Sequence, residues 1–277
     1  MNLTLIQNHG LKYANKTDVL RRHEMNDVQL YHGDCLEEMK NISDKSIDMI
    51  LCDLPYGTTK CKWDTVIPFE PLWKEYKRII KDNGAIVLFA SQPFTSFLVA
   101  SNIKMFKYEW IWHKNKGGNP LNAKKIPMKQ HESILVFYKK APTYNPQLEE
   151  RYGEGRDAVL KYKIRGGSFK DDRVYGEVDN IVRYTKYPEL RFPQSVQFFK
   201  VERGLHPTQK PVPLLEYLIK TYTNENEVVL DNCMGSGSTG VACINTNRKF
   251  IGIELEEKYF NVAKNRIEEA IDKKKNC

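Results

Sequence analysis

The chain has 277 residues, of which 41% are hydrophobic and 28% charged, and its formal net charge is +8. This composition argues against intrinsic disorder, and the length suits one large domain or one domain with a sizeable insertion. No apolar run approaches the length of a membrane span, and residues 1–26 lack the apolar core of a secretory signal. We therefore expect a cytoplasmic protein with no membrane partner.

Short β-like runs alternate with helical ones along most of the chain, which predicts an α/β fold with parallel strands. Before residue 141, we expect strands at 28–32, 46–52, 85–90, 108–113 and 132–139, and helices at 35–40, 71–81 and 94–101. No hydrophobic period is sustained from 141 to 204. After that stretch, we expect helices at 211–222, 238–245 and 256–275, and strands at 228–231 and 250–254.

The cysteines form no recognisable chemical pattern. They contain no C-x-x-C pair, and no histidine lies at zinc-ligand spacing from two of them. We interpret them as small apolar residues of a reduced interior and predict neither a disulfide framework nor a metal site. The six positions are Cys35, Cys52, Cys61, Cys233, Cys243 and Cys277.

The positive charge is concentrated between His113 and Lys210. This segment contains 20 basic and 11 acidic residues, whereas the rest of the chain contains 23 basic and 24 acidic residues. Aromatic residues and two glycine pairs are interleaved with the basic ones. Such a mixture suits a polyanion with stackable bases, so composition slightly favours nucleic-acid binding over a merely solvated basic face.

A glycine-rich turn follows the strand that ends at Asp231. Gly235, Gly237 and Gly240 match a G-x-G-x-x-G pattern, and Glu254 ends the next strand. Glycines allow a sharp turn, and an acid ending the next strand can accept hydrogen bonds from both ribose hydroxyls. The Asp231 carboxylate would repel a pyrophosphate but attract an amino-acid ammonium, which favours S-adenosylmethionine over NAD. A tight turn without a ligand is the alternative for the glycines.

A second motif, Asp53-Leu54-Pro55-Tyr56-Gly57, follows an apolar strand at the end where α/β sheets place ligand sites. It combines a hydrogen-bond acceptor, a rigid proline and an aromatic ring. The carboxylate can accept hydrogen bonds from both hydrogens of an amino group. At the same time, the aromatic side chain can stack on the ring that carries this amino group. Taken alone, the motif favours another interpretation, a helix-capping aspartate in a Pro-Gly turn with Tyr56 in the core.

Asp53-Leu54-Pro55-Tyr56 resembles the Asp-Pro-Pro-Tyr motif of DNA amino-methyltransferases. The motif is followed by the basic segment, then His206-Pro-Thr-Gln-Lys210-Pro, and finally the glycine motif. This order resembles the β class of site-specific adenine-N6 and cytosine-N4 DNA methyltransferases, and the resemblance covers nearly the whole chain from Val28. Leu54 replaces the usual first proline. That residue contributes a backbone carbonyl in the family, which leucine also provides.

The resemblance implies a Rossmann-like methyltransferase fold with a mostly parallel seven-stranded sheet, which the chain enters in circularly permuted order. It also implies an inserted target-recognition segment. The expected divisions are an N-terminal extension at 1–26, a catalytic half at 27–140, the target-recognition insertion at 141–204 and a cofactor-binding half at 205–277.

By the same resemblance, the cofactor is S-adenosylmethionine. The implied contacts are Asp231, Gly235 and Gly237 at the methionine end, Glu254 at the ribose, Asp34 near the adenine, and Thr208 and Lys210 closing the methionine pocket. For Asp34, an equal alternative is that it caps the helix at Cys35, with Glu37 completing a capping-box-like pair. For His206 and Pro207, the alternative is a turn into a proline-started helix.

The implied reaction is methylation of adenine N6 in duplex DNA. The Asp53 carboxylate and the Leu54 carbonyl would accept hydrogen bonds from the two N6 hydrogens, so that the nitrogen lone pair can attack the sulfonium methyl. The target nucleotide must leave the duplex and would stack on Tyr56. Asp53 favours adenine because cytosine-N4 enzymes typically have serine there. The Pro-Cys dipeptide of cytosine-C5 enzymes is absent from the sequence.

Double-stranded DNA is the implied partner, and we select Lys124, Lys125, Lys161 and Lys163 as its phosphate contacts. A homodimer and a cognate restriction endonuclease stay open as further partners. The alternative functions are cytosine-N4 methylation, a Rossmann NAD-dependent dehydrogenase and an inactive DNA-binding module. The dehydrogenase would leave Asp53 to Gly57 unexplained, and the inactive module would leave Asp53, Tyr56 and Asp231 unexplained.

Overall fold

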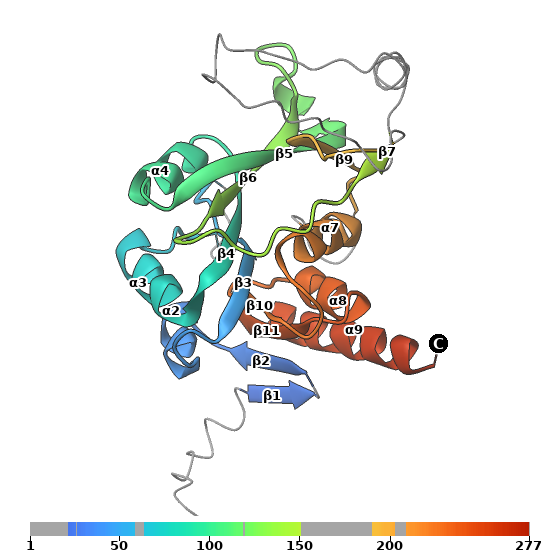
Figure 1. The fold of residues 1–277 in the computed structure, drawn as a ribbon. Coiled ribbons are helices and arrows are strands. Elements are labelled where there is room, and N and C mark those ends of the chain that lie inside the picture. Colours follow the sequence, from blue (N-terminus) through green and yellow to red (C-terminus); the bar gives the residue numbers. More distant parts are fainter. Residues whose placement is uncertain are drawn as a thin grey trace, which may run out of the picture. The chain divides into compact units, whose positions relative to one another are not determined.

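The computed structural model describes residues 22–25, 27–58, 64–118, 120–150, 190–202 and 209–276 (Figure 1). Its contacts divide the chain into two units. The main unit comprises Met1–Asn145 and Ser195–Cys277, and the second unit comprises Pro146–Gln194. Each unit is described by itself.

One sheet runs through the main unit in the order β1-β2-β11-β10-β3-β4-β6-β5-β9. Neighbouring strands from β2 to β4 are parallel, whereas β6 is antiparallel to both β4 and β5. The strands are β1 (Arg22–Met25), β2 (Val28–His32), β3 (Ile47–Asp53), β4 (Ile80–Ala90), β5 (Phe106–Gly118), β6 (Lys129–Phe137), β9 (Val196–Phe199), β10 (Val228–Asp231) and β11 (Lys249–Glu254).

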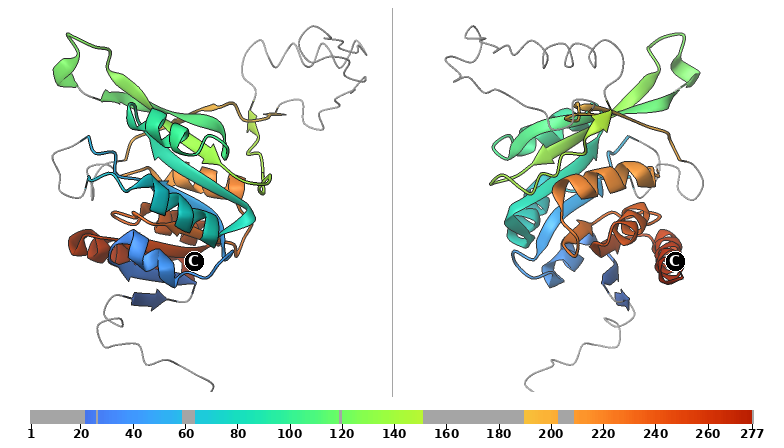
Figure 2. Two further views of the ribbon diagram at one scale, coloured as in Figure 1. Left: turned by 90° about the vertical axis from the view of Figure 1, so that its left-hand side faces the viewer. Right: turned by 45° about the vertical axis from the view of Figure 1, so that its right-hand side comes forward.

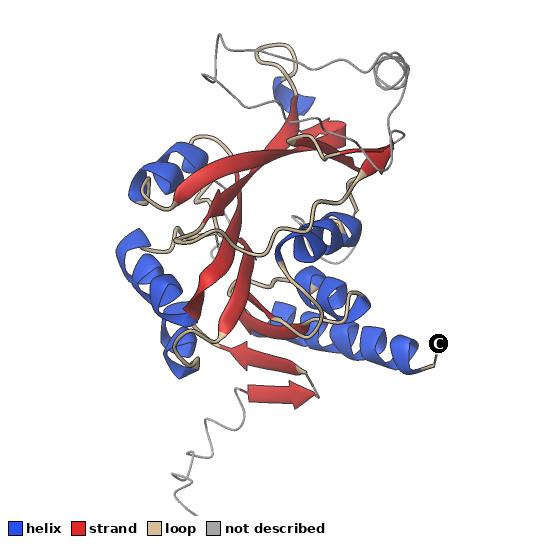
Figure 3. Cartoon of the chain, in the orientation of Figure 1, coloured by secondary structure: helices blue, strands red, loops and turns tan. Residues whose placement is uncertain are grey.

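Helices cover both faces of this sheet (Figures 1 and 3). On β3, Met49 and Leu51 belong to the core shared with α7, α8 and α9, while Ile50 and Cys52 belong to the core shared with α2, α3 and α4. This alternation follows from the two-residue period of a strand that is buried on both faces. The helices are α2 (Cys35–Glu38), α3 (Phe69–Ile79), α4 (Phe94–Ser101), α7 (Val212–Tyr222), α8 (Ser238–Asn245) and α9 (Glu257–Lys275), with 3-10 turns η1 (Met39–Asn41) and η2 (Pro120–Asn122).

The seven strands predicted from the sequence all lie in this sheet, and β1 and β9 extend its two edges. Four elements, β2, α4, α8 and β10, have the predicted bounds. The boundary near residue 80 was wrong. The helix predicted to reach Lys81 ends at Ile79, and the next strand begins at Ile80, because Ile80 pairs with Ile47 of β3.

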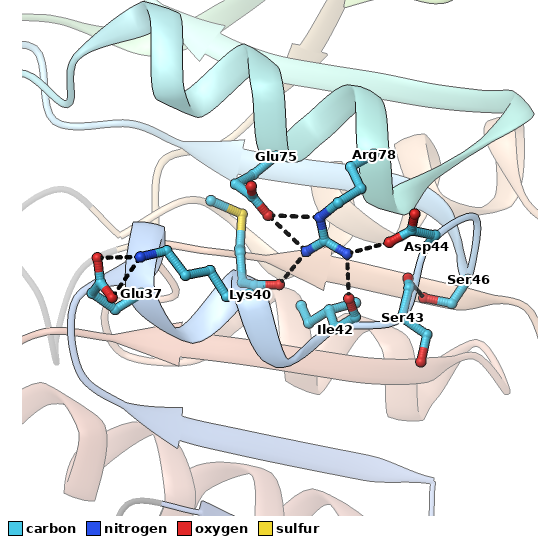
Figure 4. Close-up of polar contacts among 9 residues, drawn as sticks. Glu37, Lys40, Ile42, Ser43, Asp44, Ser46, Glu75 and Arg78 are labelled. Atoms are coloured by element: carbon cyan, nitrogen blue, oxygen red, sulfur yellow. Dashed lines mark hydrogen bonds and ion pairs between the residues drawn. The ribbon is translucent and has the colours of Figure 1, made fainter.

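A partly buried arginine, Arg78, joins α3 to the segment after α2 (Figure 4). The Arg78 guanidinium donates to the carbonyl oxygens of Met39 and Ile42, each at 2.7 Å, and forms ion pairs of 2.6 Å with Glu75 and Asp44. Because guanidinium presents donors in a fixed fork, one side chain fixes the path of this segment. The bonds thereby hold the short helix that follows the carboxyl end of β2.

In the second unit, the described strands β7 (Glu149–Glu150) and β8 (Leu190–Arg191) pair antiparallel, and Arg191 bonds Glu149 at 3.2 Å. This unit falls within the expected insertion at 141–204, whose functional bounds stay a prediction. No helix among the described residues is long and apolar enough to cross a membrane.

Candidate active site

The carboxyl ends of β2, β3, β10 and β11 meet at one cavity of about 1020 Å³. Asp53, Asp231 and Glu254, each at the end of its strand, all line it. Glu132 also lines it, because antiparallel β6 brings its beginning to this edge of the sheet. This volume lies at the upper end of the usual range for a small-molecule site.

Asp231 is a buried carboxylate on the cavity wall, with 4% of its surface exposed. It accepts hydrogen bonds from the Thr239 hydroxyl at 2.6 Å and the Cys233 N–H at 3.1 Å. Burial raises its pKa to about 6, although these hydrogen bonds act in the opposite direction. Among the described residues, no cation is paired with it. A ligand ammonium would supply the missing positive charge, which fits the amino-acid end of S-adenosylmethionine.

The glycine turn after β10 has two separate requirements. Gly235 has a φ of +53°, lines the cavity and donates its N–H to the Glu254 carboxylate at 2.8 Å. Gly237 has a φ of +78°, and a Cβ there would lie 2.9 Å from the Ala263 Cβ. Gly237 is not among the lining residues, so its observed role is to turn the chain and let α8 approach α9.

Glu254 closes this side of the cavity. Its carboxylate accepts N–H bonds from Gly235 and Glu256, the latter at 2.9 Å, and burial raises its pKa. Each carboxylate oxygen has two acceptor positions, so the group can still accept ribose hydroxyls. Asp231, the glycine turn and Glu254 together are called the cofactor side below.

Asp34 is the N-cap of α2, since its carboxylate accepts the Leu36 N–H at 2.8 Å. It also lines the cavity, so capping and cofactor binding do not exclude each other. The expected capping-box pairing of Glu37 was wrong. Its carboxylate binds the Lys40 ammonium at 2.7 Å, because one helical turn brings these two side chains together.

Asp53 and Tyr56 face each other at the end of β3. The Tyr56 hydroxyl donates to Asp53 Oδ1 at 2.6 Å, and its ring stacks on Phe94 with centroids 5.1 Å apart. Burial raises the pKa of Tyr56, as does the neighbouring Asp53 charge, so the phenol keeps its proton. Leu54 and Pro55 complete the cavity wall between them. Asp53 therefore does not cap a helix, and Tyr56 is only partly buried.

Asp64 holds Gly57 and Thr58, the two residues that follow Tyr56. Sequence reasoning did not identify Asp64. Its carboxylate accepts the N–H groups of Gly57 and Thr58, each at 2.9 Å. Gly57 has a φ of +67°, a conformation that favours glycine. These bonds hold the Asp53-Tyr56 segment against the cavity.

Lys210 lies between two carboxylates. Its ammonium contacts Asp53 and is 3.5 Å from Glu132 Oε2. Burial lowers the pKa of Lys210, but the two carboxylates outweigh this and raise it. Burial likewise raises the pKa of Glu132, but Lys210 and Lys114 outweigh it and lower it. Lys210 and Glu132 therefore stay charged.

Lys114 extends this network. Its ammonium binds Glu132 and lies 4.6 Å from the centre of the Trp112 ring. Lys114, Lys210, Asp53, Tyr56 and Glu132 are called the target side below. Sequence reasoning identified neither Lys114 nor Glu132 as part of the site, and it placed Lys210 at the methionine pocket rather than against Asp53.

The remaining predicted residues lie apart from the cavity or outside the described residues. Lys124 and Lys125 follow η2 and are exposed. Thr208, Lys161 and Lys163, together with His206 and Pro207, lie outside the described residues. The four cysteines among the described residues are free thiols, whereas Cys61 and Cys277 lie outside them. Burial raises the pKa of Cys52 to about 12, which suits an unreactive interior residue.

Comparison with known proteins identifies the family. Residues 47–265 match a family described as DNA methylase. The chain is 30% identical over 261 residues to DNA adenine methyltransferase YhdJ of Escherichia coli (strain K12), covering 87% of this chain and 83% of that protein. It is 27% identical over 255 residues to the type II methyltransferase M.HpaI of Haemophilus parainfluenzae, covering 87% and 74%.

Solved structures similar to this chain include a complex with SAM and a DNA methyltransferase. The M1.HpyAVI complex with SAM has a TM-score of 0.59 and 28% identity, covering 87% of this chain and 98% of that chain. The cytosine-N4-specific PvuII DNA methyltransferase has a TM-score of 0.60 at 15% identity, covering 89% and 92%, and supports the fold alone. The chain therefore belongs to the DNA methylase family, and its activity is DNA methyl transfer. The predicted family and the Rossmann-like methyltransferase fold are both confirmed.

Proposed function

We propose that this DNA methyltransferase transfers a methyl group from S-adenosylmethionine to the N6 amino group of adenine in duplex DNA. The observation that carries the proposal is the position of Asp53, which lies beside Tyr56 on the same cavity as Asp231. A carboxylate is a stronger acceptor for an amino group than a neutral hydroxyl. YhdJ, a relative of this chain, is named as an adenine enzyme.

The cofactor side binds S-adenosylmethionine, which supplies a methyl group on a sulfonium. Asp231 accepts the ammonium of the methionine moiety, and Glu254 accepts the ribose hydroxyls. Asp34 contacts the adenine while it caps α2, and Gly235 allows the backbone to approach the ligand. Support comes from the burial of Asp231, which has no cationic partner among the described residues, and from the position of all four residues on the cavity wall.

The target side activates the amino group. Asp53 accepts a hydrogen bond from one N6 hydrogen, and the Leu54 carbonyl accepts a hydrogen bond from the other. These two bonds direct the nitrogen lone pair away from the base ring. Tyr56 and Lys210 occupy two of the four acceptor positions of the Asp53 carboxylate, which leaves room for the amino group. Positive charge that develops on N6 is then stabilised by the Asp53 carboxylate.

Adenine N6 is inaccessible in a duplex, so the nucleotide leaves the base stack and enters the cavity. Tyr56 supplies the stacking surface, because Phe94 and the hydrogen bond to Asp53 fix its ring. Pro55 stiffens the segment between them. Thr208 is a further proposed cofactor contact.

DNA is the macromolecular substrate, and we assign Lys124 and Lys125 to its phosphates. Lys161 and Lys163 are assigned by the same reasoning from charge, as is the target-recognition role of 141–204. A homodimer, a cognate restriction endonuclease and a cytoplasmic location stay predictions.

Nucleoside analysis tests the proposal. DNA is incubated with the full chain and S-adenosylmethionine labelled in the methyl group, digested to nucleosides and separated. Label in N6-methyl-2′-deoxyadenosine is the expected result. Label in N4-methylcytosine would overturn the adenine assignment but retain the family, and label in 5-methylcytosine would overturn the proposed chemistry.

A further inference from the structure

The β5–β6 hairpin ends in a segment that packs into no core. The described residues 114–118 and 120–129 form this segment, called the arm below, and it projects from the rest of the main unit (Figure 2). Every residue from Pro120 to Met128 is exposed. The arm nevertheless has local structure, because the Lys125 and Ile126 N–H groups donate to the Asn122 carbonyl at 2.8 and 3.0 Å.

Apolar side chains are exposed on this arm. Leu121 is 96% exposed, Ile126 52% and Met128 45%. Met128 lies against the opposite strand, since a Cβ on Gly117 would be 2.9 Å from the Met128 Cβ. Leu121 has no comparable cover. Burying a leucine side chain is worth about 1.5–3 kcal/mol, so a partner that covers Leu121 would gain binding energy that folding leaves unused.

The charge around Leu121 indicates the chemistry of that partner. Residues 114–129 include five lysines and no acidic residue. Two of these lysines bind inside the main unit, Lys114 to Glu132 and Lys129 to the Ser91 hydroxyl. Lys116, Lys124 and Lys125 are exposed. An apolar tip among lysines fits a polyanion that also offers an apolar interior, and a DNA duplex with its stacked bases has both properties.

The base of the arm is part of the active site. Lys114, Lys116, Gly117 and Gly118 all line the cavity that contains Asp53. A duplex that delivers one nucleotide into this cavity therefore passes along the arm. Removing a base from the stack leaves a gap beside its neighbours, and unstacking costs a few kcal/mol per step.

From this arrangement, we propose that Leu121 is a wedge that enters the gap left by the target base. The proposal rests on the proposed function, because it requires a flipped nucleotide. Lys124 and Lys125, three and four residues further on, hold the phosphates beside the gap. Leu121 thereby stabilises the open duplex while the base lies between Tyr56 and the cofactor. The proposed wedge contacts no reacting atom, so it is a positioning residue.

The test compares two duplexes that contain the recognition sequence, as identified by sequencing modified DNA from cells expressing the protein. One is fully paired, and the other has an abasic site opposite the target base, which lowers the cost of flipping. Methylation of both is measured under single-turnover conditions for the wild type, Leu121→Ala and a control, Ile103→Ala. Ile103 is also an exposed aliphatic residue, at 62%, but it lies after α4 and outside the cavity.

Leu121→Ala should slow methylation of the paired duplex at least about tenfold and restore it to within about threefold of the wild type on the abasic duplex. Ile103→Ala should match the wild type on both. An unchanged rate on paired DNA, or an equal loss on both duplexes, would overturn the wedge. A change in the sedimentation of DNA-free Leu121→Ala would instead show that Leu121 contacts a second copy of the chain. A wild-type protein that methylates neither duplex would overturn the proposed function itself.

Discussion

The two sides of the active-site cavity manage buried charge in opposite ways. On the cofactor side, the groups among the described residues that donate hydrogen bonds to Asp231 are all neutral: the Thr239 hydroxyl, the Cys233 N–H and the Cys52 thiol. On the target side, the Asp53 and Glu132 carboxylates are paired with Lys210 and Lys114. One side is thus left with negative charge, whereas the other is balanced before any ligand arrives.

This difference matches the charges of the ligands that we assign. The amino-acid end of S-adenosylmethionine carries an ammonium, which would neutralise Asp231. An adenine base is neutral and would enter a site that is already neutral, where charge develops only during the reaction. A buried charge without a partner is costly, so each side is arranged for one ligand charge and poorly suited to the other.

The largest expected effect is on turnover when the target side loses its acceptor. Asp53→Ala should lower the single-turnover methylation rate by about 10³-fold, because the developing charge on N6 loses its stabilising carboxylate. Rapid-quench measurement with labelled cofactor checks this, and Asp272→Ala on the exposed face of α9 serves as the control. A loss smaller than tenfold would remove Asp53 from the chemical step.

Glu132→Gln should lower turnover by about 30-fold, which corresponds to about 2 kcal/mol for breaking a buried charge pair. Lys210 would then have Asp53 as its sole carboxylate neighbour in the network and would compete with the amino group for it. Steady-state kinetics with saturating cofactor checks the prediction, and Glu109→Gln on the exposed side of β5 is the matched control. Wild-type turnover in Glu132→Gln would show that Lys210 needs no second carboxylate.

A smaller effect, about tenfold, is expected from pH. The pKa of Asp231 is raised to about 6, so its carboxylate is ionised above that pH and protonated below it. Affinity for S-adenosylmethionine should therefore fall about tenfold as pH drops from 7 to 5, because about a tenth of Asp231 then remains ionised. Calorimetric titration of the wild type at several pH values measures this. Asp231→Asn should bind weakly without this pH dependence, and a flat wild-type profile would contradict the assignment.

The smallest effect concerns DNA affinity. Each phosphate contact contributes about −0.9 to the slope of log affinity against log salt, so Lys124→Gln with Lys125→Gln should make the slope shallower by about 1.8. Fluorescence anisotropy at several salt concentrations measures the slope. A control pair, Lys273→Gln with Lys275→Gln at the end of α9, should leave it unchanged. An unchanged slope in the first pair would place the DNA surface elsewhere.

The two sides of the cavity also differ in how far their residues could be predicted from the sequence. Asp53, Asp231 and Glu254 each end a parallel strand, and the carboxyl ends of parallel strands meet at one edge of a sheet. Their convergence therefore follows from hydrophobic patterning alone. The bounds of β3 were predicted to within one residue, because the run from Ile47 to Cys52 is apolar except at Asp48, as expected of a strand that is buried on both faces.

The balancing charges could not be predicted in this way. Glu132 lies near the beginning of the antiparallel strand β6, and whether the beginning or the end of this strand reaches the cavity depends on strand order, which local patterning does not contain. Lys114 lies on β5, which the sheet places beyond β6. Asp64 acts through the backbone N–H groups of Gly57 and Thr58, which lie seven and six residues before it. Such contacts depend on tertiary structure, whereas Asp231 was identified because its own strand and glycine turn are contiguous in sequence.

The division of the cavity into two sides is tested most directly by titrating S-adenosylmethionine calorimetrically into Asp53→Ala and Asp231→Ala in parallel, after thermal melting has confirmed that both are folded. Asp231→Ala should weaken binding about 100-fold, as expected when one partner of a buried charge pair is removed. Asp53→Ala should bind within about threefold of the wild type, since Asp53 is assigned to the target base. Weakened binding in Asp53→Ala with wild-type binding in Asp231→Ala would show that the two sides have been assigned the wrong way round.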